Sequence, residues 1–192
     1  MSGGTKALRA ALFTLIGLAV AGLVYGIASN WPGRAAVSTA AVAAPGPADP
    51  SPVSQSRPDF SMPDLSGTTR SIGEWDGKVL AVNFWATWCG PCKEEIPLFN
   101  AMQRRYGARG MQFVGVAMDE RAAVQDYLKT HRIDYPVLVN GEDAAGDLAT
   151  RYGDDEGVVP YTAFIDRHGR IAFVQFGAMS EELARQVIES LL

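Results

Sequence analysis

The residues best suited to chemistry in this sequence are its only two cysteines, Cys89 and Cys92, which form one Cys-x-x-Cys unit. Two thiols at this spacing can bind a metal ion or form and break a disulfide with each other. A zinc site usually needs four ligands, and the other soft ligands, His131 and His168, are not spaced as a pair. A disulfide that closes so short a loop adds little stability, so we expect a redox pair that cycles rather than a structural crosslink or a metal site.

The segments on either side of the cysteines must position them. Residues 79–85 are apolar, with β-branched and aromatic side chains, and predict a buried strand. Residues 93–106 have helical spacing, with one apolar stripe formed by Ile96, Phe99, Met102 and Tyr106. Pro91 suits the first turn of such a helix, where its missing N–H is not needed.

A strand end followed by a helix start favours thiol chemistry. The unpaired N–H groups and partial positive charge of a helix N-terminus lower the pKa of a thiol from about 8.5 to about 7 or below. We therefore expect Cys89 to be the exposed nucleophile that attacks a partner disulfide. Cys92, one turn into the helix, should be shielded and should resolve the mixed disulfide.

The motif resembles a known active site. Trp-Cys-Gly-Pro-Cys after Asn-Phe-Trp-Ala is similar to that of thioredoxins, and the longer stretch through Lys-Glu-Glu-Ile-Pro is most similar to the membrane-anchored TlpA/ResA-type thiol:disulfide oxidoreductases. The resemblance covers residues 58–192. It implies an α/β, thioredoxin-like fold with a central mixed β-sheet flanked by helices, an N-terminal β-hairpin and an extra helix–strand insertion at about residues 120–139. It also implies no cofactor other than the redox-active Cys89–Cys92 disulfide.

The remaining pattern agrees with that fold. A hairpin should turn at residues 66–67, where Ser-Gly favours a turn. The expected strands are residues 79–85, 111–118, 135–139, 161–166 and 170–176, and the expected helices are residues 89–106, 120–130, 143–152 and 180–192. Alternating strands and helices imply parallel pairing with helices on both faces, and the closing strand pair adds an antiparallel edge.

Glu95 is the third residue that we expect to carry chemistry. It lies three positions after Cys92, so both side chains share the helix face that points to the sheet. A carboxyl buried there would have a raised pKa and could relay a proton to and from Cys92, and the resemblance implies the same role. The alternative is a solvated first-turn glutamate, which fits Glu94 better. Asn83 stands where many thioredoxins place a buried aspartate, and because asparagine does not titrate, the proton relay is left to Glu95.

The expected substrate-binding residues surround the cysteines. The resemblance implies a cis Val159–Pro160 bond beside the pair, with the Val159 backbone free to hydrogen-bond with an extended peptide. Trp88 should be exposed on the docking surface, whereas Trp85 should belong to the core. Tyr161 either lines the same groove or simply packs. The predicted set is Trp88, Gly90, Pro91, Val159, Pro160 and Tyr161.

The N-terminal segment predicts a membrane anchor. Residues 10–28 carry no charge and would span about 28 Å as a helix, which is long enough to cross a hydrocarbon core. The basic flank in residues 1–9 should remain cytoplasmic. The Ala/Pro-rich residues 29–57 would be a linker, and residues 58–192 a thioredoxin-like domain facing the periplasm from the inner (cytoplasmic) membrane. A cleaved signal peptide is the alternative.

The expected function is therefore reduction of protein disulfides by a single-pass membrane protein. The net charge of −4 argues against nucleic acid as a partner. Gly-Pro between the cysteines is what thioredoxins use, with a potential of about −270 mV against about −120 mV for the oxidant DsbA. The resemblance points to disulfides of apo-cytochrome c or of copper-site assembly proteins as substrates, and to an upstream membrane thiol donor. A disulfide donor and a Cu(I) carrier are the alternatives.

Overall fold

The computed structural model describes residues 51–192. The predicted cytoplasmic segment at residues 1–9, the anchor at residues 10–28 and most of the linker lie outside the described residues. Within the described part of the chain, no helix has the length and apolar character needed to cross a membrane.

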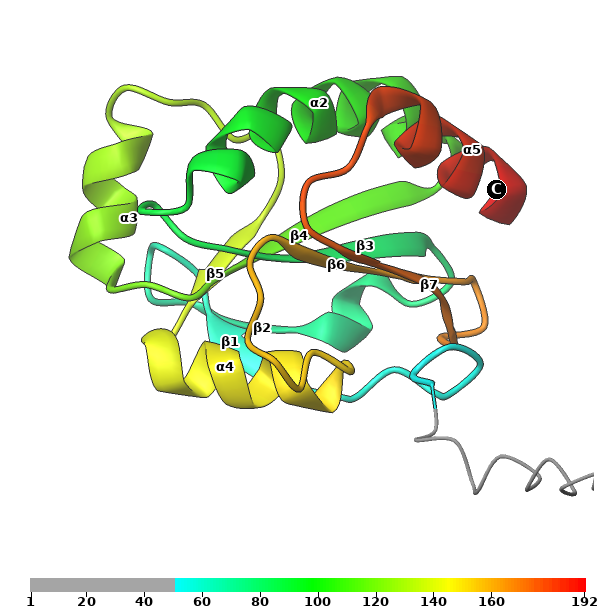
Figure 1. The fold of residues 1–192 in the computed structure, drawn as a ribbon, viewed down its shortest axis with the longest axis horizontal. Helices are drawn as coiled ribbons and strands as arrows, with labels where there is room; N and C mark the ends of the chain where they lie inside the picture. Colours follow the sequence, from blue (N-terminus) through cyan, green and yellow to red (C-terminus); the bar gives the residue numbers. More distant parts are fainter. Residues whose placement is uncertain (1–50) are drawn as a thin grey trace, which may run out of the picture. The chain divides into compact units, whose positions relative to one another are not determined.

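A five-stranded mixed sheet with the order β5-β4-β3-β6-β7 forms the centre of the fold (Figure 1). The central strand β3 (Val79–Trp85) pairs in parallel with β4 (Met111–Ala117) and antiparallel with β6 (Tyr161–Ile165). On the outer sides, β5 (Val137–Val139) is parallel to β4, and β7 (Ile171–Phe176) is antiparallel to β6. All seven residues of β3 are buried, as its continuous apolar run predicted.

Helices cover both faces of this sheet. In Figure 1, α2 (Gly90–Tyr106) and α5 (Glu181–Leu191) lie on one face, and α4 (Glu142–Arg151) lies on the other. The first face buries Phe99, Met102, Tyr106, Phe113, Phe164 and Ile188, and the second buries Phe84, Leu148, Tyr152, Tyr161 and Ile171. The predicted thioredoxin-like mixed sheet between helices is therefore confirmed.

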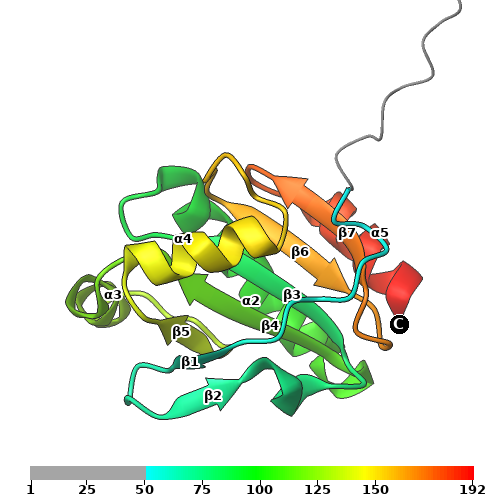
Figure 2. The same ribbon diagram turned by 90° about the horizontal axis from the view of Figure 1, so that it is seen from below.

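The two predicted additions to the sheet are also present. β1 (Ser61–Pro63) and β2 (Thr69–Ser71) form an antiparallel hairpin, which leads into a short 3-10 helix. Figure 2 shows this hairpin beside β5, where Asp64 makes an isolated bridge to Leu138. The insertion consists of α3 (Arg121–Leu128) and β5. β5 begins two residues later than predicted, after Pro136, which has no N–H to donate to the strand ladder.

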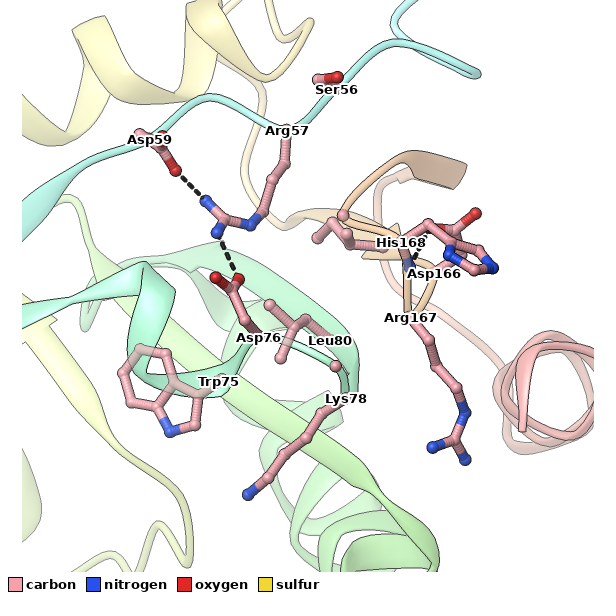
Figure 3. Close-up of a pocket in the computed structure, with 13 residues that line it drawn as sticks. Ser56, Arg57, Asp59, Trp75, Asp76, Lys78, Leu80, Asp166, Arg167 and His168 are labelled. Carbon is pink, nitrogen blue, oxygen red and sulfur yellow. Dashed lines mark hydrogen bonds and ion pairs between the residues drawn. The ribbon is translucent and has the colours of Figure 1, made fainter.

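The end of the predicted linker belongs to the domain instead. The Ser54 N–H donates to the carbonyl of Ile171 at 2.7 Å, so the segment pairs with the start of β7. The Arg57 guanidinium bonds to the carboxylates of Asp59 at 2.5 Å and Asp76 at 2.6 Å (Figure 3). The prediction that the linker runs through Arg57 is therefore wrong. The Ser/Pro-rich composition of this segment did not indicate that it would bond to residues far away in the sequence.

Candidate active site

Cys89 and Cys92 form a disulfide at the point where β3 ends and α2 begins. Cys89 is the N-cap of α2, and its Sγ accepts the N–H of Cys92 at 3.1 Å. Pro91 lies in the first turn, as predicted. Once the disulfide opens, this N–H and the partial positive charge of the helix end stabilise a thiolate on Cys89.

The two cysteines differ in exposure less than predicted. Cys89 is 5% exposed and Cys92 is fully buried. The prediction that Cys89 is exposed is therefore wrong, because its sulfur turns inward to Cys92 and packs among Trp85, Ile96 and the half-buried Val159. Cys89 is still the more accessible of the two cysteines, as predicted, since only Cys89 offers any surface to a partner.

Glu95 is buried in α2, one turn after Cys92. Its Oε1 accepts a hydrogen bond from the Asn83 amide at 2.9 Å, and its Oε2 accepts one from the Met179 N–H at 3.3 Å. Burial destabilises the carboxylate and raises the pKa of Glu95 to about 7, although both hydrogen bonds act in the opposite direction. The prediction of a buried carboxyl with a raised pKa is confirmed. Glu95 can thus gain or lose a proton near neutral pH on the helix face that it shares with Cys92.

Asn83 holds this carboxyl in place from the middle of β3. Its amide nitrogen donates to Glu95 and to the Thr162 hydroxyl at 3.0 Å, while its Oδ1 has no hydrogen-bond partner among the described residues. Thr162 and Met179 are site residues that the sequence did not indicate. Thr162 lies directly opposite Asn83 in the pairing of β3 with β6. It could have been predicted only if the register of these two strands had been known.

The loop before β6 lies beside the disulfide. The Val159–Pro160 bond is cis, as the resemblance implied. Val159 packs against the apolar cluster that contains both cysteines, and the Pro160 carbonyl accepts the N–H of Gly177 at 2.8 Å. Within residues 51–192, the Val159 N–H and carbonyl have no backbone partner. They are free to pair with an extended peptide, as in strand addition.

The tryptophans lie as predicted. Trp88 is 61% exposed and stands next to the exposed Gly90 and Pro91, whereas Trp85 is fully buried. The exposed residues form an accessible rim around the disulfide, and their contact with substrate remains a prediction.

Tyr161 does not line the groove. It is fully buried, and its hydroxyl donates to the Tyr152 carbonyl at 2.7 Å. The packing alternative is therefore the correct one, because the first position of β6 points into the core. Phe176, at the end of β7, packs on Tyr161 with ring centroids 4.9 Å apart and is 48% exposed. It presents an aromatic surface near Pro160 that the sequence did not indicate.

Asp119 fixes the loop that carries Trp88. Its carboxylate accepts the Thr87 N–H at 2.9 Å and the Thr87 hydroxyl at 2.5 Å. Thr87 lies two residues before Cys89, so the carboxylate at the end of β4 determines the path of the chain into the disulfide. Sequence reasoning missed this residue because the contact joins the ends of two different strands.

Comparisons with known proteins agree with this site. A family model described as Redoxin matches residues 52–192. The thiol-disulfide oxidoreductase ResA of Geobacillus thermodenitrificans is 29% identical over 128 residues, which cover 66% of this chain and 71% of that protein. ResA of Bacillus subtilis is 28% identical over 119 residues, or 62% of this chain and 64% of that protein.

The solved structures give the same result. A putative thiol:disulfide interchange protein DsbE from Chlorobium tepidum has a TM-score of 0.66 at 28% identity, with 73% of this chain and 98% of that chain covered. A thioredoxin family thiol:disulfide interchange protein from the same organism has a TM-score of 0.63 at 31% identity, with 71% and 95% covered. The chain thus belongs to the Redoxin family, as a thioredoxin-like thiol:disulfide oxidoreductase of the ResA/TlpA type.

Proposed function

We propose that this oxidoreductase is a membrane-tethered reductant of disulfides in exported proteins. The observation that carries the proposal is the Cys-Gly-Pro-Cys disulfide at the start of α2 with the titratable Glu95 buried one turn below it. Cys92 is fully buried, and its thiol needs a base before it can attack. Glu95, with a pKa of about 7, is available as that base at neutral pH.

The reducing cycle begins from the dithiol. The Cys89 thiolate attacks a substrate disulfide, so a bond forms between Cys89 Sγ and one substrate sulfur while the other leaves as a thiolate. Cys92 then gives its proton to Glu95, and its thiolate attacks Cys89 Sγ. The second substrate thiolate leaves, both substrate sulfurs take up protons, and two electrons have passed from the Cys89–Cys92 pair to the substrate. An upstream membrane thiol donor restores the dithiol.

Substrate recognition would use the exposed rim of the site. An extended segment of the substrate pairs with the backbone of Val159, which places its disulfide over Cys89. Trp88, Gly90 and Pro91 supply the exposed surface around that position. We propose disulfides of apo-cytochrome c or of copper-site assembly proteins as substrates.

The N-terminal sequence supports a proposed location at the inner membrane. We propose that residues 10–28 span the inner membrane, with residues 1–9, which include Lys6 and Arg9, in the cytoplasm. Residues 51–192 would then work in the periplasm, within reach of membrane-bound thiol donors.

The redox state of the chain in living cells tests the direction of electron flow. Cells are quenched with acid and their free thiols are alkylated with a reagent that adds mass. Because the chain has only two cysteines, each molecule shifts by two increments or by none. A reductant is held mainly as the dithiol and becomes oxidised when its donor is depleted. A chain found mainly as the disulfide would instead indicate a disulfide donor.

A further inference from the structure

The end of the sheet opposite the cysteines carries a group of cations. β3 leads to Cys89 at its carboxyl end, and Lys78 directly precedes its other end. The Gly110 carbonyl accepts the Val79 N–H at 2.9 Å, which places the preceding Arg109 beside Lys78. The Arg167 guanidinium donates to the Arg109 carbonyl at 3.1 Å. We call the set Lys78, Arg105, Arg109 and Arg167 the basic end.

These four side chains have no Asp or Glu partner within residues 51–192, although the Arg167 guanidinium also donates to the Leu192 carbonyl at 3.2 Å. None of them lies within ion-pair distance of a side-chain carboxylate in the described part of the chain. Arg105 and Arg109 lie over the Tyr106 ring, at 5.2 and 5.3 Å from its centroid. The nearby carboxylate of Glu189 is already bonded to Arg185 and to the Tyr106 hydroxyl. No direct ion pair with an Asp or Glu side chain therefore neutralises the cations of the basic end.

The pocket at this end is lined by Lys78 and Arg167 as well as by Arg57. It holds about 380 Å³, and its central guanidinium, Arg57, is neutralised by Asp59 and Asp76. Figure 3 shows Lys78 and Arg167 extending to the same side, away from Arg57. Cations that make no direct ion pair and are spread over three segments suit an extended anionic surface better than a small anion held inside the pocket.

The chain outside the structure joins the domain at this same end. The Arg57 N–H donates to the carbonyl of Gly169 at 2.8 Å and the Ile171 N–H donates to the carbonyl of Gln55 at 2.9 Å, both at the start of β7. Residues 1–50, which include the predicted membrane span, precede this junction. The opposite end, around the cysteines, exposes Glu94 and Glu120 together with Lys93, and Asp155 and Glu156 are exposed on the loop that leads from α4 to Val159.

We propose that the basic end docks onto the anionic phospholipid headgroups of the membrane that holds the tether. This inference rests on the tether proposed above. Each lysine or arginine near an anionic bilayer strengthens attachment about fivefold, and salt weakens it because charges are screened over about 8–10 Å. Docking by the basic end turns the opposite end and its disulfide away from the bilayer, towards soluble exported polypeptides.

The full chain with its native disulfide intact allows a direct test. The added thiol of Ala108→Cys, between Arg105 and Arg109, is labelled with a fluorophore, and Glu156→Cys gives a matched probe on the loop before Val159. Each protein is reconstituted in vesicles of phosphatidylcholine alone, or with one quarter phosphatidylglycerol, that carry a headgroup-attached quencher. Arg105→Gln/Arg109→Gln removes two cations of the basic end, and Lys129→Gln/Arg132→Gln removes two elsewhere.

With phosphatidylglycerol, quenching of the Ala108 probe should exceed that of the Glu156 probe several-fold at low salt, and the excess should vanish at high salt. Arg105→Gln/Arg109→Gln should weaken docking roughly 25-fold, the product of two fivefold terms, while Lys129→Gln/Arg132→Gln leaves it unchanged. Equal quenching of both probes in both lipids would overturn the proposal. Flotation with pure phosphatidylcholine vesicles tests the tether separately, because a chain that fails to float lacks the anchor whatever the probes report.

Discussion

Replacing Glu95 by glutamine should change how the stability of the protein depends on pH. In the folded protein the pKa of the Glu95 carboxyl is about 7, against an ordinary value of 4.5, because the side chain is buried. A carboxyl that ionises less readily in the folded state favours folding while it is protonated. Its contribution is fully present below pH 4.5 and is lost as the pH rises through about 7.

The size of this effect follows from the two pKa values. Each pH unit between them corresponds to 1.36 kcal/mol, so the free energy of unfolding should fall by about 3 kcal/mol between pH 4.5 and pH 8 on account of Glu95 alone. Glu95→Gln is neutral throughout and should lack this fall. Any constant loss from altered hydrogen bonds to Asn83 and Met179 does not change the slope.

Urea unfolding of the oxidised full chain in mild detergent, followed by far-UV circular dichroism from pH 4.5 to 8, measures the difference. Glu94→Gln is the matched control, because this neighbour is exposed and should keep the slope of the unmodified protein. Parallel pH profiles for Glu95→Gln and the unmodified protein would refute the reasoning. The same variant should slow the resolving attack by Cys92 about 10²-fold at pH 7, as expected for loss of a general base.

Two further substitutions test the assigned roles. Cys92→Ser should accumulate a mixed disulfide with a disulfide-bonded model peptide, visible on non-reducing gels, because nothing resolves the bond at Cys89; stronger capture by Cys89→Ser would contradict the order of attack. Trp88→Ala should raise the KM for a protein disulfide several-fold without changing the melting temperature, since the side chain is 61% exposed. The matched Trp85→Ala variant removes a fully buried ring and should cost about 3–5 kcal/mol of stability, so equal melting temperatures for the two variants would contradict the placement of these side chains.

Most of the fold could be predicted from the sequence because the patterns that indicate strands and helices are local. β3 is a continuous apolar run, and the stripe along α2 has one period throughout, so both elements and the cysteines between them could be predicted. Glu95 could be predicted as well, because its burial follows from its spacing to Cys92 on one helix face.

The rest of the site depends on contacts between distant segments. Thr162 reaches Asn83 through the register of β3 and β6, and Met179 reaches Glu95 where the chain returns after β7. The direction of Tyr161 depends on where β6 starts, and a shift of one residue exchanges the buried and exposed faces of a strand. The composition of the segment likewise did not predict that Arg57 forms ion pairs with Asp59 and Asp76.

The equilibrium reduction potential of the Cys89–Cys92 pair tests the central claim most directly. The full chain is equilibrated in thiol/disulfide buffers of known potential, and the fraction of dithiol is read from alkylation of its two cysteines. A reductant with Gly-Pro between its cysteines should have a midpoint of about −250 mV or lower. A midpoint of about −120 mV, typical of a strong oxidant, would contradict the proposed function and identify the protein as a disulfide donor.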